Sequence, residues 1–219
     1  SLHDALPILS FWIEYGEKNI LFDTGQSDAF IKNADLLDID LSKADAIILS
    51  HGHYDHTGGL EAILSLAPNA TVYLHPDAPK IRYSCPPQKP PKDVSMPPGA
   101  CQKIADLAPK ARIVYTAKPE LIAPGLTVTG AIPRITDYED TGGPFYLDKG
   151  AQNPDLIKDD QALIISTAKG TVVILGCAHA GVINTLEHVI TIAKQPIHAV
   201  LGGTHLRAAS DRRLKKTIE

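Results

Sequence analysis

The run of residues 50–59 gathers the side chains best suited to bind a metal. Three imidazoles and one carboxylate fall within six residues of it: His51, His53, Asp55 and His56. Imidazole combined with carboxylate suits zinc, iron or manganese better than magnesium or calcium, which prefer oxygen ligands throughout. Four such groups so close together would repel one another when charged, or lack hydrogen-bond partners, unless a cation held them. The run therefore predicts a metal site.

Three further polar residues follow apolar runs in the same way, each near glycine: Asp23, His179 and His205. Because such apolar runs are typical of strands, we expect these side chains at strand ends, where distant segments can converge on one edge of a sheet. The glycines at positions 176, 181, 202 and 203 would let the backbone approach such a site closely. We expect Asp23 to orient a ligating imidazole, as carboxylates behind metal-bound histidines commonly do.

Several other polar residues have more than one interpretation. Asp160 begins an expected strand and either orients a ligand in the same way or is a plain turn residue. Arg134 either contacts a phosphate or carboxylate of a substrate or is a surface charge. Cys177 lies at a buried-looking strand end, and we expect it to be structural rather than a ligand. We also expect His75 to be structural and His198 to be packed inside the last strand.

Hydrophobic patterning predicts the elements that must position these residues. The expected strands are 10–15, 19–23, 45–50, 71–74, 111–115, 126–129, 161–167, 171–175 and 197–201. The expected helices are 27–37, 58–66, 101–108 and 181–194. We expect Thr57 to cap the second of these helices. The buried side of the last one is expected to carry Ile183, Leu186, Ile190 and Ala193.

Residues 76–99 contain eight of the 17 prolines. The segment is too long for a plain connection, so it predicts an irregular insertion. Two interpretations remain open: a lid or substrate-binding loop, or a passive excursion of the chain.

The bulk composition narrows the functional classes. A net charge of −4 and a pI near 6.1 argue against nucleic acid as the main partner, because a phosphate backbone calls for a basic face. No apolar run approaches the ~20 residues of a membrane span, so we expect no membrane partner. Three cysteines indicate no disulfide framework, and a reducing cytoplasm is the expected location.

The two ends of the chain look unnatural. Residues 1–8 resemble one reading frame of a common sequencing adapter translated into protein, so we expect them to be non-native and assign no role to His3 or Asp4. The chain has no initiator methionine, and residues 215–219 stop inside an amphipathic pattern. We therefore expect a single domain over 9–219 that is truncated at both ends.

The loop 51–56 after a strand, with Asp23-Thr24-Gly25 upstream and spaced histidines downstream, resembles the metallo-β-lactamase superfamily from residue 9 onward. The resemblance implies an α/β (α+β) fold, an αββα four-layer sandwich. In it two mixed sheets lie face to face with helices outside, and the metal site lies at one sheet edge. It also implies one or two divalent transition metals, with zinc favoured over iron or manganese.

The resemblance further implies how the ligands divide. By the superfamily pattern, His51 and His53 bind one metal, and Asp55 and His56 bind a second. The chain has no histidine between positions 75 and 179, where most members supply one. We therefore expect His179 to complete the first metal or to bridge the two, and His205 to complete the second.

Five runs narrow the resemblance to one branch of the superfamily: 22–27, 49–59, 132–134, 176–181 and 202–206. This branch contains 7,8-dihydropterin-6-yl-methyl-4-(β-D-ribofuranosyl)aminobenzene 5′-phosphate synthases and related metal-dependent hydrolases. It implies a small-molecule substrate, either a pterin or another phosphate-bearing compound.

Three functions remain open. The first is a hydrolase that uses a metal-activated water, with Asp55 as the catalytic residue that orients the nucleophile or accepts its proton. The second is a transferase that joins a dihydropterin methyl diphosphate to an aminobenzene ribofuranosyl phosphate and releases pyrophosphate. The third is a non-catalytic, metal-stabilised ligand binder.

Overall fold

A computed structural model describes residues 9–219, so the expectation for residues 1–8 lies outside the described part of the chain.

The first sheet has the strand order β1 (Phe11–Tyr15), β2 (Lys18–Phe22), β3 (Ala46–Ile48), β4 (Thr71–Leu74) and β7 (Ile113–Tyr115). β1 and β2 form the predicted hairpin, and the other neighbours pair in parallel. Ile47 of β3 faces a helical core, whereas Ile48 faces the second sheet. Both faces of the strand are covered, which explains why its residues are apolar throughout.

The second sheet has the strand order β13 (Ile197–Gly202), β12 (Gly170–Leu175), β11 (Ala162–Thr167), β9 (Leu126–Val128) and β8 (Glu120–Ala123). Only β12 and β13 are parallel in it. Leu163 and Ile174 face the first sheet, while Ile164 and Val173 face a helix. Successive side chains of β11 and β12 thus point alternately into two separate hydrophobic layers.

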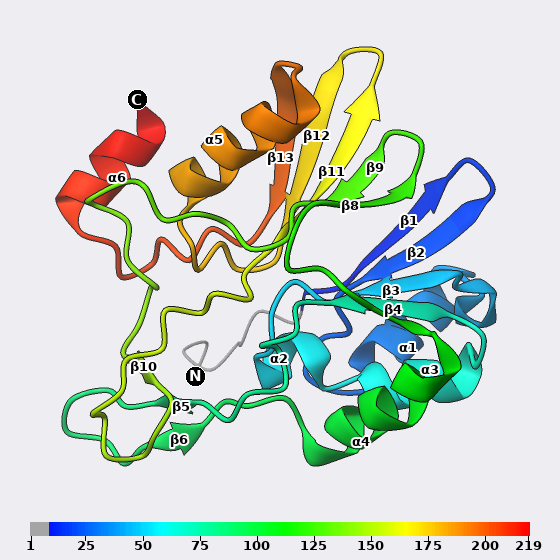
Figure 1. Cartoon of the computed structure of the whole chain (residues 1–219), viewed down its shortest axis with the longest axis horizontal. Helices are drawn as coiled ribbons and strands as arrows, with labels where there is room; N and C mark the ends of the chain where they lie inside the picture. The colour runs from blue at the N-terminus through cyan, green and yellow to red at the C-terminus, as the bar shows by residue number, and fades with distance from the viewer. Residues whose placement is uncertain (1–8) are drawn as a thin grey trace.

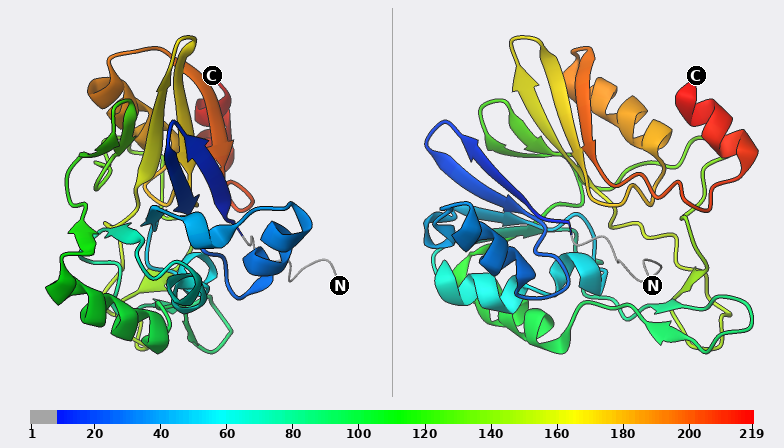
Figure 2. Two further views of the ribbon diagram at one scale, coloured as in Figure 1. Left: turned by 90° about the vertical axis from the view of Figure 1, so that its right-hand side faces the viewer. Right: turned by 180° about the vertical axis from the view of Figure 1, so that it is seen from behind.

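Helices cover the outer faces of both sheets (Figure 1). The helices are α1 (Ala29–Leu36), α2 (Tyr54–Thr57), α3 (Leu60–Leu66), α4 (Pro98–Leu107), α5 (Val182–Ala193) and α6 (Asp211–Ile218). Short 3₁₀ turns occupy Leu41–Lys43 and Ala108–Lys110. α1, α3 and α4 pack on the first sheet, and α5 packs on the second. The predicted αββα sandwich is confirmed, and its layers are seen from two further sides in Figure 2. In the described part of the chain, each helix is too short or too polar to cross a membrane.

The proline-rich segment contributes to a small third sheet. Its strands β5 (Tyr83–Ser84) and β6 (Lys92–Asp93) pair with each other, and β5 also pairs with β10 (Phe145–Tyr146) from a distant segment. Figure 1 places this sheet beside the open end of the sandwich, away from the helical layers. The last residues of the segment belong to α4, which begins at Pro98 because proline is well suited to the first turn of a helix.

A buried arginine anchors this segment to the body of the protein. The Arg82 side chain is 1% exposed, and its guanidinium contacts both carboxylate oxygens of Asp159 at 2.8 and 2.9 Å. Its Nε lies 3.3 Å from Asp155. Asp159 in turn accepts a hydrogen bond from the Gly52 amide at 2.7 Å. The segment is therefore tied, through one carboxylate, to the loop that carries His51 and His53.

Several local predictions were wrong. Thr57 does not cap α3: it ends α2, and its hydroxyl donates to the His53 carbonyl at 3.0 Å, while Gly59 precedes α3. β8 was not predicted, because its edge position leaves Leu121 exposed and its pattern indistinct. His198 is exposed rather than packed, because β13 is also an edge strand.

The buried side of α5 was predicted only in part. Leu186 and Ala193 do pack against the core, but Ile190 is 45% exposed. The fully buried positions include Thr185 and Val189. The apolar side of α5 is broad and includes Val182 and Val189 beside Leu186 and Ile190, so spacing alone could not identify the line that meets the sheet.

Candidate metal site

Two strands from different sheets end side by side and define the site. The loop 50–53 and α2 follow β3 of the first sheet, and the turn 176–181 follows β12 of the second (Figure 1). The sheets are joined here by Gln161, whose backbone amide donates to the Ser50 carbonyl at 3.0 Å and whose side-chain amide donates to the Leu49 carbonyl at 2.8 Å. Side chains that leave the ends of β3 and β12 are thereby brought together.

One cluster consists of imidazoles alone. A nitrogen from each of His51, His53 and His179 lies within 4.8 Å of the others, and all three side chains are buried. His51 Nε2 lies 3.0 Å from His53 Nδ1. Two nitrogens that each bind zinc at about 2.0 Å in tetrahedral geometry are roughly 3.3 Å apart, close to this separation.

A second cluster adjoins the first and includes sulfur. It consists of His51, His56 and Cys177, again within 4.8 Å of one another, with His56 Nε2 3.0 Å from Cys177 Sγ. The half-buried Asp55 has its Oδ2 3.9 Å from the same His56 nitrogen. His205 adjoins the first cluster, where its ring centroid lies 4.6 Å from that of His179. The structure thus brings together all six residues predicted as ligands and adds Cys177.

Asp23 and Ser50 orient two of these imidazoles. Asp23 has a left-handed φ of 60°, and its carboxylate lies 2.6 Å from His56 Nδ1, which donates to it. The same carboxylate accepts the Ser50 hydroxyl at 2.7 Å. The Ser50 oxygen therefore accepts from His51 Nδ1, which lies 2.9 Å away. In both rings Nδ1 carries a hydrogen, and Nε2 is the nitrogen that faces the site.

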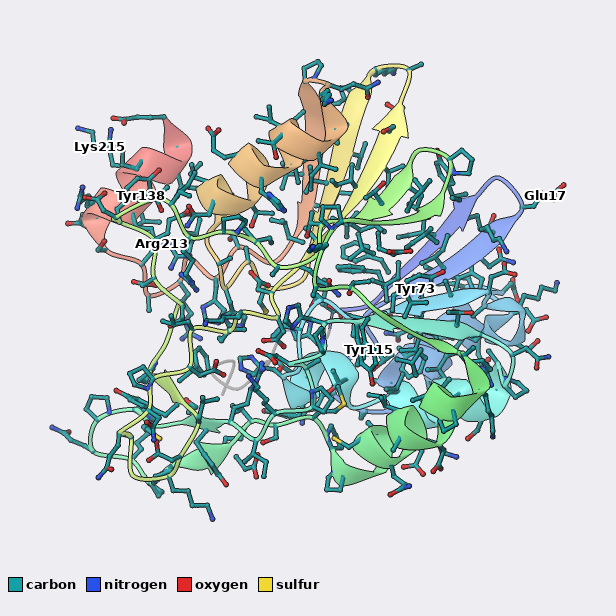
Figure 3. All side chains as sticks on the ribbon, in the orientation of Figure 1. Glu17, Tyr73, Tyr115, Tyr138, Arg213 and Lys215 are labelled. Atoms are coloured by element: carbon teal, nitrogen blue, oxygen red, sulfur yellow. The ribbon has the colours of Figure 1, made fainter. Side chains whose placement is uncertain are left out.

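His179 is oriented by the backbone of another segment. Its Nδ1 donates to the Thr141 carbonyl at 2.7 Å, which again leaves Nε2 free. The segment that carries Thr141 is itself held by α6, because Nη1 of the buried Arg213 donates to Asp140 at 2.6 Å. Figure 3 shows Arg213 beside the same segment, near Tyr138.

The electrostatics favour neutral ligands in the first cluster. Burial, reinforced by the neighbouring imidazoles, holds the pKa values of His51, His53 and His179 well below their usual value. Burial would also lower the pKa of His56, but the adjacent Asp23 carboxylate raises it well above the usual range. Burial raises the pKa of the Cys177 thiol.

The residues present fit a divalent transition metal. His53 Nε2 is buried and has no hydrogen-bond partner within residues 9–219. Such an orphaned buried nitrogen calls for an explanation, and a bound ion or an ordered water is a common one. Imidazole nitrogens, a carboxylate and a cysteine sulfur form a donor set typical of zinc sites.

Two of the predicted accessory residues contact the backbone beside His179. The Asp160 carboxylate accepts from the Ala180 amide at 2.6 Å, and burial raises the pKa of Asp160 to about 7. The Arg134 guanidinium donates to the carbonyls of His179, Ala180 and Leu156. A role for Arg134 in substrate contact, and for Asp160 behind a ligand, stays a prediction.

A cavity of about 810 Å³ opens in front of the clusters. Its wall includes Phe145, whose ring centroid lies 4.8 Å from that of His53 and 5.3 Å from that of His179. Two cations, Lys92 and Arg207, also line it. Lys92 Nζ donates to the Tyr54 hydroxyl at 2.6 Å and lies over the Tyr54 ring.

The sequence analysis missed three residues of this site, Ser50, Thr141 and Phe145, and it favoured a structural role for Cys177. Ser50 had a signal, since it directly precedes His51 and follows β3, the strand that pairs with the one before Asp23. Phe145 had none, because it reaches the site only through the pairing of β10 with β5.

Comparisons with known proteins agree with this geometry. The family model of the metallo-beta-lactamase superfamily matches residues 3–201. A 7,8-dihydropterin-6-methyl-4-(beta-D-ribofuranosyl)-aminobenzene-5'-phosphate synthase of Methanocaldococcus jannaschii is 32% identical over 227 residues, covering 96% of this chain and 74% of that protein. An uncharacterized protein of the same organism is 33% identical, covering 94% of this chain and 75% of that protein.

Solved structures of other proteins also resemble this fold. Tm1679, a metal-dependent hydrolase of the β-lactamase superfamily, has a TM-score of 0.73 at 28% identity and covers 94% of this chain and 76% of its own. A quorum-quenching N-acyl homoserine lactone lactonase, with a TM-score of 0.51 at 14% identity over 91% of this chain and 80% of its own, shares the fold alone. Because the family model spans most of the chain and the synthase relative is similar along nearly all of it, the chain belongs to the metallo-β-lactamase superfamily.

Proposed function

We propose that this protein is a metal-dependent hydrolase that acts on a small molecule with a metal-activated water. The observation that carries the proposal is the pair of adjoining ligand clusters, which share His51 and lie against a cavity of about 810 Å³. Cavities of this size accommodate small-molecule substrates. The three cysteines are free, which supports a reducing cytoplasm as the place of action.

In this proposal the metal-holding residues are His51, His53 and His179 for one position, and Asp55, His56 and His205 for a second. One or two divalent transition metals, with zinc preferred, would supply Lewis-acid activation of water and of the scissile group. Asp55 lines the cavity and would orient the nucleophile or accept its proton. Phe145 supplies an apolar wall that excludes bulk water beside the His53 and His179 rings.

The test is metal analysis of the purified chain, followed by a panel of phosphodiesters, lactones and pterin diphosphates. We expect one or two metals per chain and turnover that a chelator abolishes. His53→Ala should lose both metal and turnover, whereas His198→Ala, which removes an exposed imidazole outside the site, should keep both. Full turnover by metal-free protein would rule the proposal out.

A second candidate is a transferase of the synthase type. It is supported by the name of the 32% identical relative and by Lys92 and Arg207 at the cavity, which suit an anionic substrate. The expected reaction joins a dihydropterin methyl diphosphate to an aminobenzene ribofuranosyl phosphate. Pyrophosphate release that requires the amine would favour the transferase, and phosphate or pyrophosphate release without the amine would favour hydrolysis.

A further inference from the structure

We propose that Arg213 of α6 is a positioning residue for the metal site, which acts through Asp140 on the rings of His179 and His205. Residues 139–145 connect these groups, and we call them the strap. The inference rests on the proposed function only in requiring that the site bind metal. It adds to the site a helix that supplies no ligand.

The strap contacts two of the proposed ligands. The Thr141 carbonyl accepts a hydrogen bond from His179 Nδ1 at 2.7 Å. A Cβ at Gly142 would overlap the His205 ring, so the backbone of the strap is packed directly against that imidazole. Phe145 ends the strap, and its ring centroid lies 5.3 Å from that of His179 and 6.4 Å from that of His205. The path of the strap therefore sets the orientation of both rings.

One carboxylate oxygen shapes the strap. Asp140 Oδ1 accepts a hydrogen bond from the Gly142 amide at 2.8 Å, which closes a turn around Thr141. The same oxygen accepts a hydrogen bond from Nη1 of Arg213 at 2.6 Å. Because Arg213 holds the oxygen on which the turn depends, it also fixes the direction of the Thr141 carbonyl.

α6 is joined to this region by charge more than by apolar packing. The structure describes every residue of α6, and among them Arg213 alone is buried. Two ion pairs lead from the helix to the neighbouring segment, Arg213 with Asp140 and Arg212 with Asp137. Figure 1 shows α6 beside this segment and apart from both sheets. The helix therefore acts on the site through what its arginines hold.

The burial of Arg213 is better explained by positioning than by stability. Its side chain is fully buried, whereas the Asp140 side chain is 63% exposed. Its Nε and Nη2 have no hydrogen-bond partner within residues 9–219. A guanidinium in this state is costly to desolvate, and a buried ion pair is weak evidence for stability. What the pair supplies is one fixed arrangement of helix and strap.

The other end of the strap is anchored independently. The Glu139 carboxylate accepts hydrogen bonds from the amides of Ile183 and Asn184 at 2.9 and 2.8 Å. These amides belong to the first turn of α5, where the helix offers them no partner of its own. Loss of Arg213 should therefore release only the part of the strap that contacts His179 and His205, and leave the fold in place.

The test compares two arginines that are neighbours in α6. Arg213→Met removes the contact with Asp140, and because that carboxylate is largely exposed, water can solvate it. Arg212→Met is the matched control, since it breaks an exposed ion pair with Asp137, outside the strap. Zinc affinity is measured by competition with a chelator, at a temperature where circular dichroism shows each variant folded. We expect about 10–100-fold weaker binding for Arg213→Met, as for other residues behind metal ligands.

The control variant should bind zinc as the wild type does. Arg213→Lys keeps the charge and should recover part of the affinity, which a merely structural loss would not predict. Wild-type affinity in folded Arg213→Met overturns the inference, and so does an equal loss in Arg212→Met.

A second measurement uses metal-free protein. In proton NMR, the His179 Nδ1 hydrogen held by Thr141 should give a slowly exchanging resonance, which is identified by its absence in His179→Gln. We expect this resonance in the wild type and in Arg212→Met, and its loss or shift in Arg213→Met. An unchanged resonance in the folded variant overturns the inference.

Asp140→Asn covers the case in which Arg213→Met does not fold. It keeps an oxygen for the Gly142 amide but weakens the hold of Arg213, so both zinc affinity and the resonance should change. Wild-type values of both would overturn the inference. Failure of the proposed function is separate: wild-type protein that binds no metal would refute that function, while the resonance would still report whether Arg213 positions His179.

Discussion

Replacement of Arg82 by methionine is expected to destabilise the protein severely. Methionine keeps much of the apolar stem but removes the guanidinium that contacts Asp159 at 2.8 and 2.9 Å and Asp155 at 3.3 Å. Asp159 is fully buried and Asp155 is only 8% exposed, so water would solvate the stranded carboxylates poorly. The variant would leave one or two buried charges without a cation.

The magnitude follows from that burial. Removing one partner of a buried ion pair costs about 3–5 kcal/mol, because the remaining charge is uncompensated. This is a large part of the ~5–15 kcal/mol by which a typical domain is stable. At about 2–4 °C per kcal/mol for a protein of this size, Tm should fall by roughly 6–20 °C.

The assay is thermal unfolding followed by circular dichroism in the presence of a chelator, so that metal binding does not mask the loss. The matched control is Arg212→Met, which breaks the 2.8 Å ion pair with Asp137. In that pair the Arg212 side chain is 60% exposed and the Asp137 side chain is 77% exposed. That variant should melt within error of the wild type. Equal shifts for the two variants would refute the reasoning. The double variant Arg82→Met/Asp159→Asn should recover part of the loss, because it removes one stranded charge.

Three other substitutions test the surroundings of the site. Asp23→Asn should weaken metal binding by about 10–100-fold in a chelator competition, because the carboxylate that orients His56 is lost; unchanged affinity would contradict that role. Gly52→Ala should lower both Tm and metal content, since its Cβ would overlap the Ala78 carbonyl; a wild-type Tm would count against it. Burial lowers the pKa of His75 below its usual 6.5, so the folded state favours the neutral ring and wild-type stability falls as the pH drops through that value. Urea unfolding between about pH 5 and 8 should show a smaller acid loss for His75→Gln, and parallel curves would contradict it.

The sandwich was expected from the resemblance to the superfamily, whereas the central strands were predicted from their own apolar pattern, which has a physical reason. Strands such as β3 are covered on both faces, so Ala46, Ile47 and Ile48 form a continuous apolar run that ends at the ligand loop. Local signals of this kind identify central strands and the loops that follow them. They failed at the edge strand β8, which was not predicted, and at His198, which is exposed because the predicted strand β13 also lies at an edge.

The candidate site was predicted as far as residue type reveals chemistry. Histidines beside glycine at strand ends carry their own signal, and the structure does bring His179 and His205 to the loop 51–56. Cys177 was expected to be structural because an apolar run precedes it, and sequence cannot tell on which side of a strand end the sulfur emerges. Phe145 and Thr141 depend on contacts between segments more than 30 residues apart, as in the 38-residue separation of His179 and Thr141. Such contacts are set by tertiary packing.

The proposed ligands are divided between two consecutive stretches of the chain, which bears on its biosynthesis. The first sheet is complete by Tyr115, and the second is built from residues 120–202. A nascent chain that has been made only as far as the first sheet carries the loop 51–56 but lacks Cys177, His179 and His205. It can offer a metal only part of the donor set, and therefore only weak binding. If the proposed ligands hold the metal, tight binding would have to wait until β13 has left the ribosome, and bound metal would then report that both sheets have been made and have closed on each other.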